Sequence, residues 1–274
     1  MKRRLFCTLG PRCYRISVEK EILKRKIKDL FHHVEFAKQR DGEFPNIVKG
    51  HRSVIVRRLN GVELRLQQNK AANLKLACEK LNGVVIRPGE VFSFWKLVGR
   101  PTKRKGYKEG LVISKSMLTS GIGGGLCQMA NMVHWLVLNS PLTDTELHHH
   151  SDALFPDERR RVPFGTGTSV SYNYIDYRFK NDTDQSLQLL TWIEDGDLCG
   201  ELRSENPFPY RYRLEEEDHH FSMEDGIFYR ISKVFRLVID RESGNVLKKE
   251  LILDNHSKVM YDYSLIPEDQ IRQP

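Results

Sequence analysis

The 274-residue sequence lacks the long apolar segment that a membrane-spanning helix requires. No window approaches the roughly 20 consecutive apolar residues of such a helix. The N-terminal stretch MKRRLFCTLGPRCYRISVEKEILKRK also lacks the apolar core of a secretory signal, because a proline and repeated charges interrupt it. We therefore expect a protein that is cytoplasmic or peripheral at the cytoplasmic membrane.

Cysteine is scarce as well. The five cysteines are separated by wide, irregular gaps: Cys7, Cys13, Cys78, Cys127 and Cys199. An odd number with such gaps fits neither a disulfide framework nor the CxxC spacing of a structural zinc site. We interpret most of them as reduced thiols and expect no cofactor. The sequence also lacks internal repeats and low-complexity segments.

Basic residues outnumber acidic ones, 44 to 36, which gives a formal net charge of +8. An anionic partner would suit this balance: a membrane surface, a nucleic acid or a phosphate-bearing substrate. A solvated basic surface without a specific partner fits the composition equally well. Charge alone does not choose among them.

Most of the excess positive charge lies in residues 1–45, which we predict to be a basic N-terminal helical arm. Apolar residues recur there at spacings of three and four, which is typical of an amphipathic helix: Ile22, Leu23, Ile27, Leu30, Phe31 and Val34. Such a helix either packs on the core or lies on an anionic membrane, and packing is the commoner outcome.

We predict an α+β fold, with helices packed on antiparallel β-sheet. The core domain is expected over 46–205 and a β-rich extension, an antiparallel meander, over 206–274. SVIVRRL and VELRLQQ flank Asn60-Gly61 and predict a hairpin, and NKAANLKLACEKLNG predicts a helix. SVSYNYIDYRFKN, LQLLTWIED and DLCGELRSE alternate as strands.

The segment GIGGGLCQMANMVHWLVL combines a glycine-rich bend with a helix. Its glycines allow a sharp turn and a close backbone approach, which would put Cys127 at the helix N-terminus. The exposed N–H groups and the positive end of the helix dipole favour a thiolate there and can also hold an oxyanion. The segment therefore indicates a cysteine nucleophile of the acyl-transfer type.

Several histidines are candidates for the base. His134 lies two helical turns beyond Cys127, about 11 Å along the axis, which is too far for a direct hydrogen bond. His148 and His150 lie in the loop ELHHHSD, which can fold back over the start of the helix, with Glu146 or Asp176 to orient the imidazole.

Two alternatives stay open at this point. Cys127, His148 and His150 together would also suit a zinc ion, and the histidine run would equally suit a solvated or capping role.

The motifs VVIRPGEVFSFWKLVG, GIGGGLCQMAN, ELHHHSDALFP and IDYRFKN follow one another in an order that resembles the VanW-like family of bacterial cell-envelope proteins. The resemblance is clearest over about 74–202. It implies a link to glycopeptide (vancomycin) resistance, and some members resemble peptidoglycan transpeptidases with a cysteine nucleophile. We therefore expect a transpeptidase-like acyl transferase or hydrolase, or a non-catalytic module that binds precursors or a partner.

The resemblance also implies roles for individual residues. Cys127 corresponds to the nucleophile, and the ExHxHS motif supplies the other catalytic candidates Glu146, His148 and His150. The expected substrate-binding and oxyanion residues surround these positions: Gly123, Gly124, Gly125, Gln128, Asn131 and Ser151. The expected partner is a peptidoglycan stem peptide or an anionic cell-wall precursor, with peripheral contact to an anionic membrane; no nucleic acid is expected.

Two features depart from the family pattern. The family often carries GxDAxV after the histidine loop, whereas this chain reads GTGTSV, so that Gly167 stands in place of the aspartate. Envelope relatives also have a membrane helix or a signal, and from this sequence we expect neither.

Overall fold

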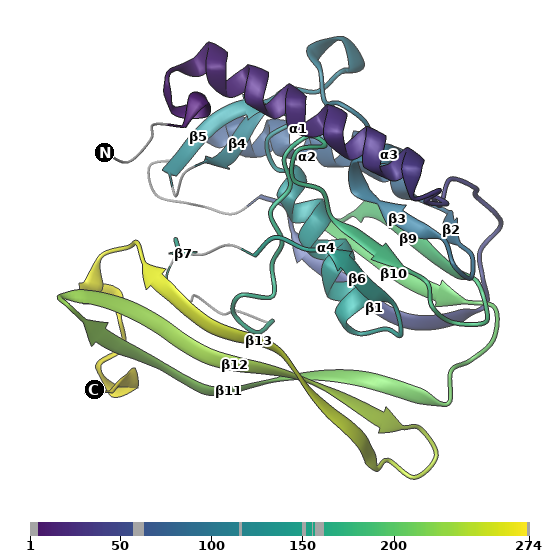
Figure 1. Cartoon of the computed structure of the whole chain (residues 1–274). Coiled ribbons are helices and arrows are strands. Elements are labelled where there is room, and N and C mark those ends of the chain that lie inside the picture. Colours follow the sequence, from purple (N-terminus) through teal and green to yellow (C-terminus); the bar gives the residue numbers. More distant parts are fainter. Residues whose placement is uncertain are drawn as a thin grey trace.

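A computed structural model describes residues 5–56, 63–114, 117–149, 152–154, 156 and 162–272. Its architecture is α+β with mainly antiparallel sheets, as the sequence predicts (Figure 1). The helices are α1 (Pro11–Phe31), α2 (Leu64–Leu81), α3 (Phe94–Val98) and α4 (Leu126–Leu138), with short 3-10 helices η1 (Phe6–Thr8), η2 (Lys103–Lys105), η3 (Tyr263–Leu265) and η4 (Glu268–Gln270). Within these described residues, no helix is long and apolar enough to cross a membrane.

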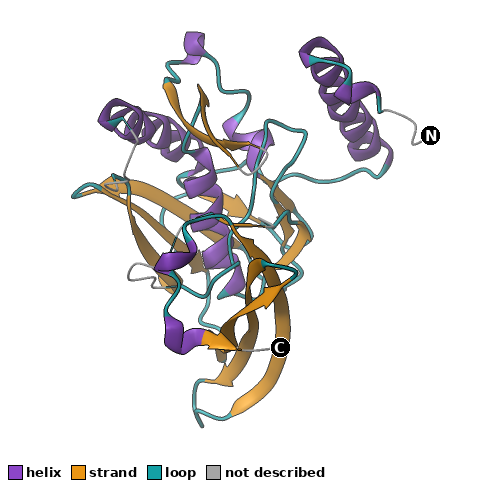
Figure 2. Cartoon of the chain, turned by 90° about the vertical axis from the view of Figure 1, so that its left-hand side faces the viewer, coloured by secondary structure: helices purple, strands orange, loops and turns teal. Residues whose placement is uncertain are grey.

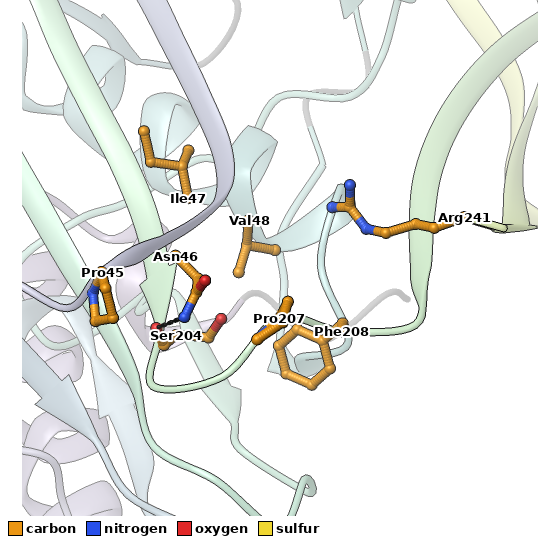
Figure 3. A pocket seen from close by; sticks show the side chains of 8 residues that line it. All are labelled: Pro45, Asn46, Ile47, Val48, Ser204, Pro207, Phe208 and Arg241. Carbon is orange, nitrogen blue, oxygen red and sulfur yellow. Dashed lines mark hydrogen bonds between the residues drawn. The ribbon is translucent and has the colours of Figure 1, made fainter.

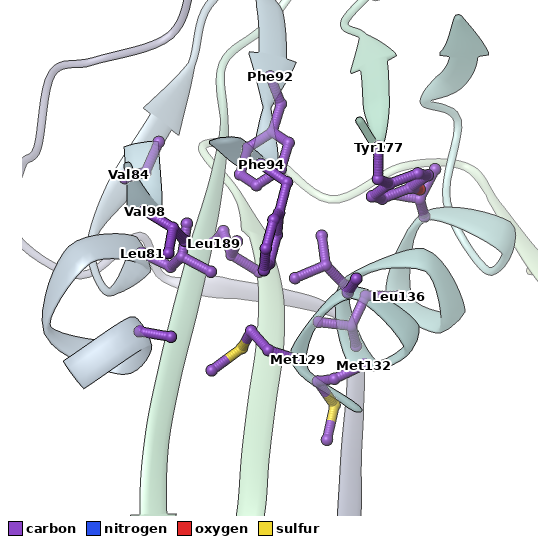
Figure 4. Close-up of a cluster of buried hydrophobic side chains, with 14 of the residues drawn as sticks. Leu81, Val84, Phe92, Phe94, Val98, Met129, Met132, Leu136, Tyr177 and Leu189 are labelled. Carbon is purple, nitrogen blue, oxygen red and sulfur yellow. The ribbon is translucent and has the colours of Figure 1, made fainter. Parts of the chain in front are cut away.

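A four-stranded antiparallel sheet supports the centre of the molecule. Its order is β1 (Asn46–Val54), β10 (Asp197–Ser204), β9 (Leu187–Glu194) and β2 (Val84–Ile86). Helices α2 and α4 pack on this sheet. Figure 4 shows their side chains directed toward one another, with Met129 and Met132 of α4 near Leu189 of β9. Burial of this apolar face is the main force that fixes α4.

The C-terminal part forms a second sheet, which is dominated by three long strands (Figure 1). Its order is β14 (Ile271–Arg272), β11 (Tyr210–Glu224), β12 (Ile227–Asp240), β13 (Val246–Val259) and β7 (Asp152–Ala153). The meander β11-β12-β13 is antiparallel, whereas the short β14 and β7 add in parallel at the edges. A separate small apolar cluster that includes Phe221 and Phe228 stabilises it.

Two smaller sheets complete the structure. One has the order β3 (Val91–Ser93), β8 (Arg178–Lys180) and β6 (Thr143–Glu146), and the other pairs β4 (Glu109–Ser114) with β5 (Met117–Ile122). The two-stranded sheet leads into α4, and β6 leads into the histidine loop. These two small sheets therefore carry the segments in which the site is predicted.

The hairpin predicted around Asn60-Gly61 is wrong in its second strand. Helix α2 begins at Leu64, within VELRLQQ, while residues 57–62 lie outside the described part. A single 18-residue helix buries Gln67, Leu74 and Cys78 on one face, and this burial outweighs a short strand-like alternation.

The strand predicted over SVSYNYIDYRFKN is also mostly wrong, because only Arg178–Lys180 is extended in a sheet. The strands LQLLTWIED and DLCGELRSE are confirmed as β9 and β10.

The predicted N-terminal helix is confirmed as α1, but its orientation differs from the expected packing. Of the apolar residues in the predicted stripe, only Ile22 is buried, whereas Leu23, Ile27, Leu30 and Phe31 are exposed. The helix therefore turns most of its apolar residues away from the core.

The glycine-rich turn before α4 lies directly against another main chain. A Cβ atom on Gly124 would overlap the backbone of Gly110 in β4, and a Cβ on Gly110 would come within 2.7 Å of the Gly124 carbonyl oxygen. Backbone atoms cannot move aside as a flexible side chain can. Glycine is therefore required at both positions by close approach.

Substitution of Gly124 tests this contact. We expect Gly124→Ala to lower the free energy of unfolding by roughly 3 kcal/mol, because the new methyl group must displace backbone. Gly42→Ala is the matched control, since nothing lies within 4 Å of a Cβ at that position. Urea denaturation measures both changes, and equal stabilities for the two variants would contradict the close approach.

Candidate functional site

Cys127 lies in the first turn of α4, as the sequence predicts. The helix begins at Leu126, and Gly125 caps it in the left-handed region with φ +96°. Gly123 also has a positive φ, +81°. A β-carbon would be strained at both glycines, so the turn that presents Cys127 depends on their conformational freedom.

Asn73 of α2 fixes this turn, and the sequence analysis missed it. Its amide nitrogen donates to the carbonyl oxygens of Gly124 (2.9 Å) and Lys108 (3.0 Å), and its oxygen accepts from the N–H of Lys108 (2.8 Å). The side chain is fully buried. A signal was present, because Asn73 precedes Ala77 and Leu81 by four and eight residues and so shares their buried helix face.

The Cys127 thiol is directed at the backbone. Its Sγ donates to the carbonyl oxygen of Val170 at 3.9 Å, and the residue is only partly accessible. Burial raises the pKa of the Cys127 thiol above its ordinary value. The direction is opposite to the one that the helix N-terminus favours, so in this conformation the sulfur carries its proton at neutral pH.

The segment that includes Val170 covers the start of α4, and we call residues 165–170 the cover segment. The N–H of Thr168 donates to the side-chain oxygen of Asn131 at 2.7 Å, and the N–H of Ser169 donates to the carbonyl oxygen of His148 at 2.7 Å. The cover segment thus bridges α4 and the histidine loop. Asn131 holds this segment in place.

Gly167 lies beside the same asparagine. A Cβ at this position would lie 3.4 Å from the side-chain oxygen of Asn131. The position at which the family pattern has an aspartate therefore faces Asn131, one helical turn from Cys127.

His148 pairs with Glu146, the acid predicted to orient it. The two side chains approach to 3.0 Å between His148 Nε2 and Glu146 Oε1. Glu146 also accepts a bidentate pair from Arg25 and a 2.9 Å hydrogen bond from the N–H of Asp176. Burial by itself raises the pKa of Glu146, but these hydrogen bonds outweigh it, so its pKa lies below the ordinary value.

The other predicted base, His150, and the neighbouring Ser151 lie outside the described residues. In the described part of the chain, no hydrogen bond joins the Cys127 sulfur to an imidazole. The link between Cys127 and His148 runs instead through the backbone of the cover segment. His149, which the sequence analysis did not select, contacts that segment through its ring, with Nδ1 3.2 Å from the carbonyl oxygen of Gly165.

Two further candidate residues, His134 and Asp176, have structural partners. His134 is buried, with Nδ1 3.2 Å from the hydroxyl of Tyr177, which in turn donates to Asp144 at 2.8 Å. Asp176 accepts from four donors, among them Ser93 at 2.6 Å. His134 is therefore a core histidine with a structural partner.

Gln128 connects α4 to the end of β1. Its side-chain nitrogen donates to the Ser53 hydroxyl at 2.7 Å and to the Val54 carbonyl oxygen at 3.0 Å. This amide nitrogen is therefore engaged in the resting structure.

No group of three or more His, Cys, Asp or Glu side chains is arranged to hold a metal ion among the residues that the structure describes. An open pocket of about 360 Å³ lies between β1, the end of β10 and Arg241 (Figure 3). Its lining includes Pro45, Ile47 and Phe208, and it contains none of the predicted site residues.

The depressed pKa of Glu146 predicts a pH dependence of stability. A carboxyl group with a lowered folded-state pKa stabilises the fold above its unfolded pKa of about 4.3, and this contribution is lost as the pH falls through the folded-state pKa. Glu146→Gln should therefore unfold more easily than wild type at pH 7 and lose less stability on acidification.

Glu268→Gln, at an exposed carboxyl group of η4, is the control and should keep the wild-type profile. Urea denaturation between pH 3 and pH 7 measures all three proteins. If the stability of wild type and of Glu146→Gln changed with pH in the same way, the lowered pKa of Glu146 would be contradicted.

Comparisons with known proteins agree with these motifs. The family model described as "VanW like protein" matches residues 69–203, which include Cys127, Glu146 and His148. The chain is 33% identical over 201 residues to the "Vancomycin B-type resistance protein VanW" of Enterococcus faecalis. The aligned segment covers 73% of this chain and 73% of that protein. The chain is also 29% identical over 146 residues to the "Uncharacterized protein YoaR" of Bacillus subtilis, covering 53% of this chain and 46% of that protein. No solved structure matches significantly. The chain therefore belongs to the VanW-like family.

Proposed function

We propose that this protein is a cysteine-dependent acyl transferase or hydrolase that acts on peptidoglycan stem peptides or their precursors, in the context of glycopeptide resistance. The observation that carries the proposal is the position of Cys127, in the first turn of α4 directly after a glycine turn held by main-chain contact. The printed name of the Enterococcus relative, a vancomycin resistance protein, supports the context.

The chemistry assigned to this position is acyl transfer through a thioester. The Cys127 sulfur attacks an amide carbonyl carbon, its proton passes to the base, and the leaving amine takes a proton as the C–N bond breaks. An acceptor amine or water then releases the acyl group and restores the thiol. His148, held by Glu146, is the described candidate for the base, and His150 is the other.

Backbone N–H groups at the start of α4 are the proposed oxyanion donors. The N–H of Leu126 lies 3.4 Å from the Gly123 carbonyl oxygen, which is long for a hydrogen bond and leaves it the more available donor. The N–H of Gln128 donates to Gly125 at 3.0 Å in the resting structure.

The cover segment must move for this reaction to occur. The carbonyl oxygen of Val170 accepts a hydrogen bond from the Cys127 thiol, and burial keeps the sulfur protonated. Thiolate formation therefore requires that a substrate displace residues 165–170 or that these residues open beforehand. On this proposal, the described structure is the closed, inactive form of the site.

A second candidate function is a non-catalytic module that binds a precursor or a partner enzyme. The raised pKa of Cys127 favours it, because a protonated, covered thiol is a poor nucleophile. This candidate predicts ligand binding that survives removal of the sulfur. In both cases the proposed location is the cytoplasm or the cytoplasmic membrane surface, where lipid-linked and nucleotide-linked precursors carry diphosphates that suit the positive net charge.

A covalent intermediate tests the enzymatic proposal. Incubation with stem-peptide substrates should add one acyl group to wild-type protein, detected by intact-protein mass spectrometry. Cys127→Ala should lose this adduct and the turnover, whereas Cys13→Ala, which removes a thiol of α1, should keep both. Turnover by Cys127→Ala equal to that of wild type would refute the mechanism, and binding without any adduct in wild type would favour the module.

Thiol reactivity tests the cover segment. At pH 7 we expect iodoacetamide to alkylate Cys127 more slowly than Cys13, because burial raises the pKa of Cys127. Asn131→Ala removes the side-chain bond to Thr168 and should speed alkylation of Cys127 several-fold without affecting Cys13. Peptide mapping of the alkylated protein measures both sites, and an unchanged rate at Cys127 would mean that Asn131 does not control access.

A further inference from the structure

Helix α1 faces the rest of the protein with its polar side. Arg25 and Asp29 point inward with Ile22, which is buried. Leu23 and Ile27, on the opposite side of the helix, are 58% and 46% exposed. This is the reverse of an ordinary surface helix, which buries its apolar stripe.

Ion pairs fix this rotation. The Arg25 guanidinium makes a bidentate pair with Glu146 and also donates to the carbonyl oxygens of Asn173 (3.0 Å) and Tyr174 (3.1 Å). Asp29 forms a second bidentate pair with Arg178, at 2.6 and 3.0 Å. Rotation of α1 would break both pairs and leave charges buried without partners, which is strongly unfavourable.

The apolar residues on the outward side share one face of the helix, with Lys20 among them. Their spacing of seven, four, three and one residues puts them within about a third of the helix circumference. We call this set the outer apolar row: Ile16 (59% exposed), Leu23 (58%), Ile27 (46%), Leu30 (74%) and Phe31 (77%). Single exposed apolar residues are common, but several large apolar side chains on one helix face mark a surface that a membrane or another molecule covers.

Basic side chains flank the row. Lys20, Lys24, Lys26 and Lys28 are all exposed. The helix has seven basic and three acidic residues, and each acidic residue already has a cationic partner, for example Arg100 for Glu19. The surroundings of the outer apolar row are therefore positively charged, and they complement an anionic surface.

We propose that α1 is an interfacial helix that binds this protein to an anionic lipid bilayer. An apolar row flanked by lysines is the arrangement that lets a helix lie in the membrane plane, with its aliphatic side chains at the acyl boundary and its ammonium groups among the headgroups. Figures 1 and 2 show α1 at the periphery of the molecule, where a flat surface can reach it. A second copy of the chain is a poorer occupant, because its own lysines would oppose those of the first.

The inner side of the same helix contacts the candidate site. Arg25 pairs with Glu146, which pairs with His148. The bilayer surface would then lie about one helix diameter, roughly 10 Å, from Glu146. If the proposed function holds, this location suits a substrate whose diphosphate is linked to a lipid.

Vesicle flotation tests the proposal with the full-length protein. We expect it to float with vesicles of phosphatidylglycerol and phosphatidylcholine, to bind pure phosphatidylcholine vesicles much more weakly, and to lose affinity as salt rises. Absence of binding to the anionic vesicles, or equal binding to both kinds, overturns the proposal.

Variants locate the binding surface. The triple variant Leu23→Ser, Ile27→Ser and Leu30→Ser should lose about tenfold or more in affinity for anionic vesicles, since these side chains supply the apolar area. Val246→Ser with Leu247→Ser, at exposed positions of β13, is the matched control and should bind like wild type. Circular dichroism checks that each variant is folded. Wild-type binding by the triple variant overturns the assignment to α1.

Two further measurements separate the other outcomes. Sedimentation velocity detects self-association. If the wild-type protein dimerises, the triple variant does not, and no vesicle binding is seen, then a second copy covers the outer apolar row and the proposal is overturned. Cys127→Ala should bind vesicles like wild type. Loss of enzymatic activity and loss of membrane binding are therefore distinguishable.

Discussion

The carboxylate of Glu146 is the charge on which the arrangement of the candidate site depends. It receives the guanidinium of Arg25, the N–H of Asp176 and the ring of His148, so it joins α1, the segment before β8 and the histidine loop. These donors stabilise the ionised form despite partial burial. Because Arg25 leaves α1 on the side opposite to the outer apolar row, the interaction that positions His148 also turns that row toward solvent.

Local pattern predicted much of the fold. Strand-forming residues bounded by turn residues predicted β9, β10, β12 and β13 correctly. Burial alternates along β12, whereas the first five residues of β9 are all buried. The alternation in VELRLQQ misled, because a short apolar period of two is also compatible with a helix that continues for 18 residues. The sequence predicted the helical period of α1 but not which face of the helix turns inward. That face is decided by the ion pairs of α1 with Glu146 and Arg178.

The candidate site was predictable only in part. Glycines followed by a cysteine and an apolar helix are consecutive in the sequence, so the position of Cys127 at the start of α4 could be inferred. The partners that set its chemistry are distant: Val170 lies 43 residues from Cys127, and Asn73 lies 51 residues from Gly124. Burial of the thiol arises from those distant contacts. A helix N-terminus alone predicts a lowered pKa, and desolvation reverses the direction.

Main-chain contact between Gly110 and Gly124 has an implication for how members of such a family can diverge. A side chain at either glycine would overlap the backbone of the other segment, so the turn before Cys127 has no room for a larger residue at these two positions. The cover segment, residues 165–170, reaches the start of α4 and the histidine loop through hydrogen bonds such as those of Thr168 to Asn131 and of Ser169 to His148. On the proposed function, main-chain geometry therefore fixes the turn that presents Cys127, and differences in the acyl donor must arise elsewhere around the site.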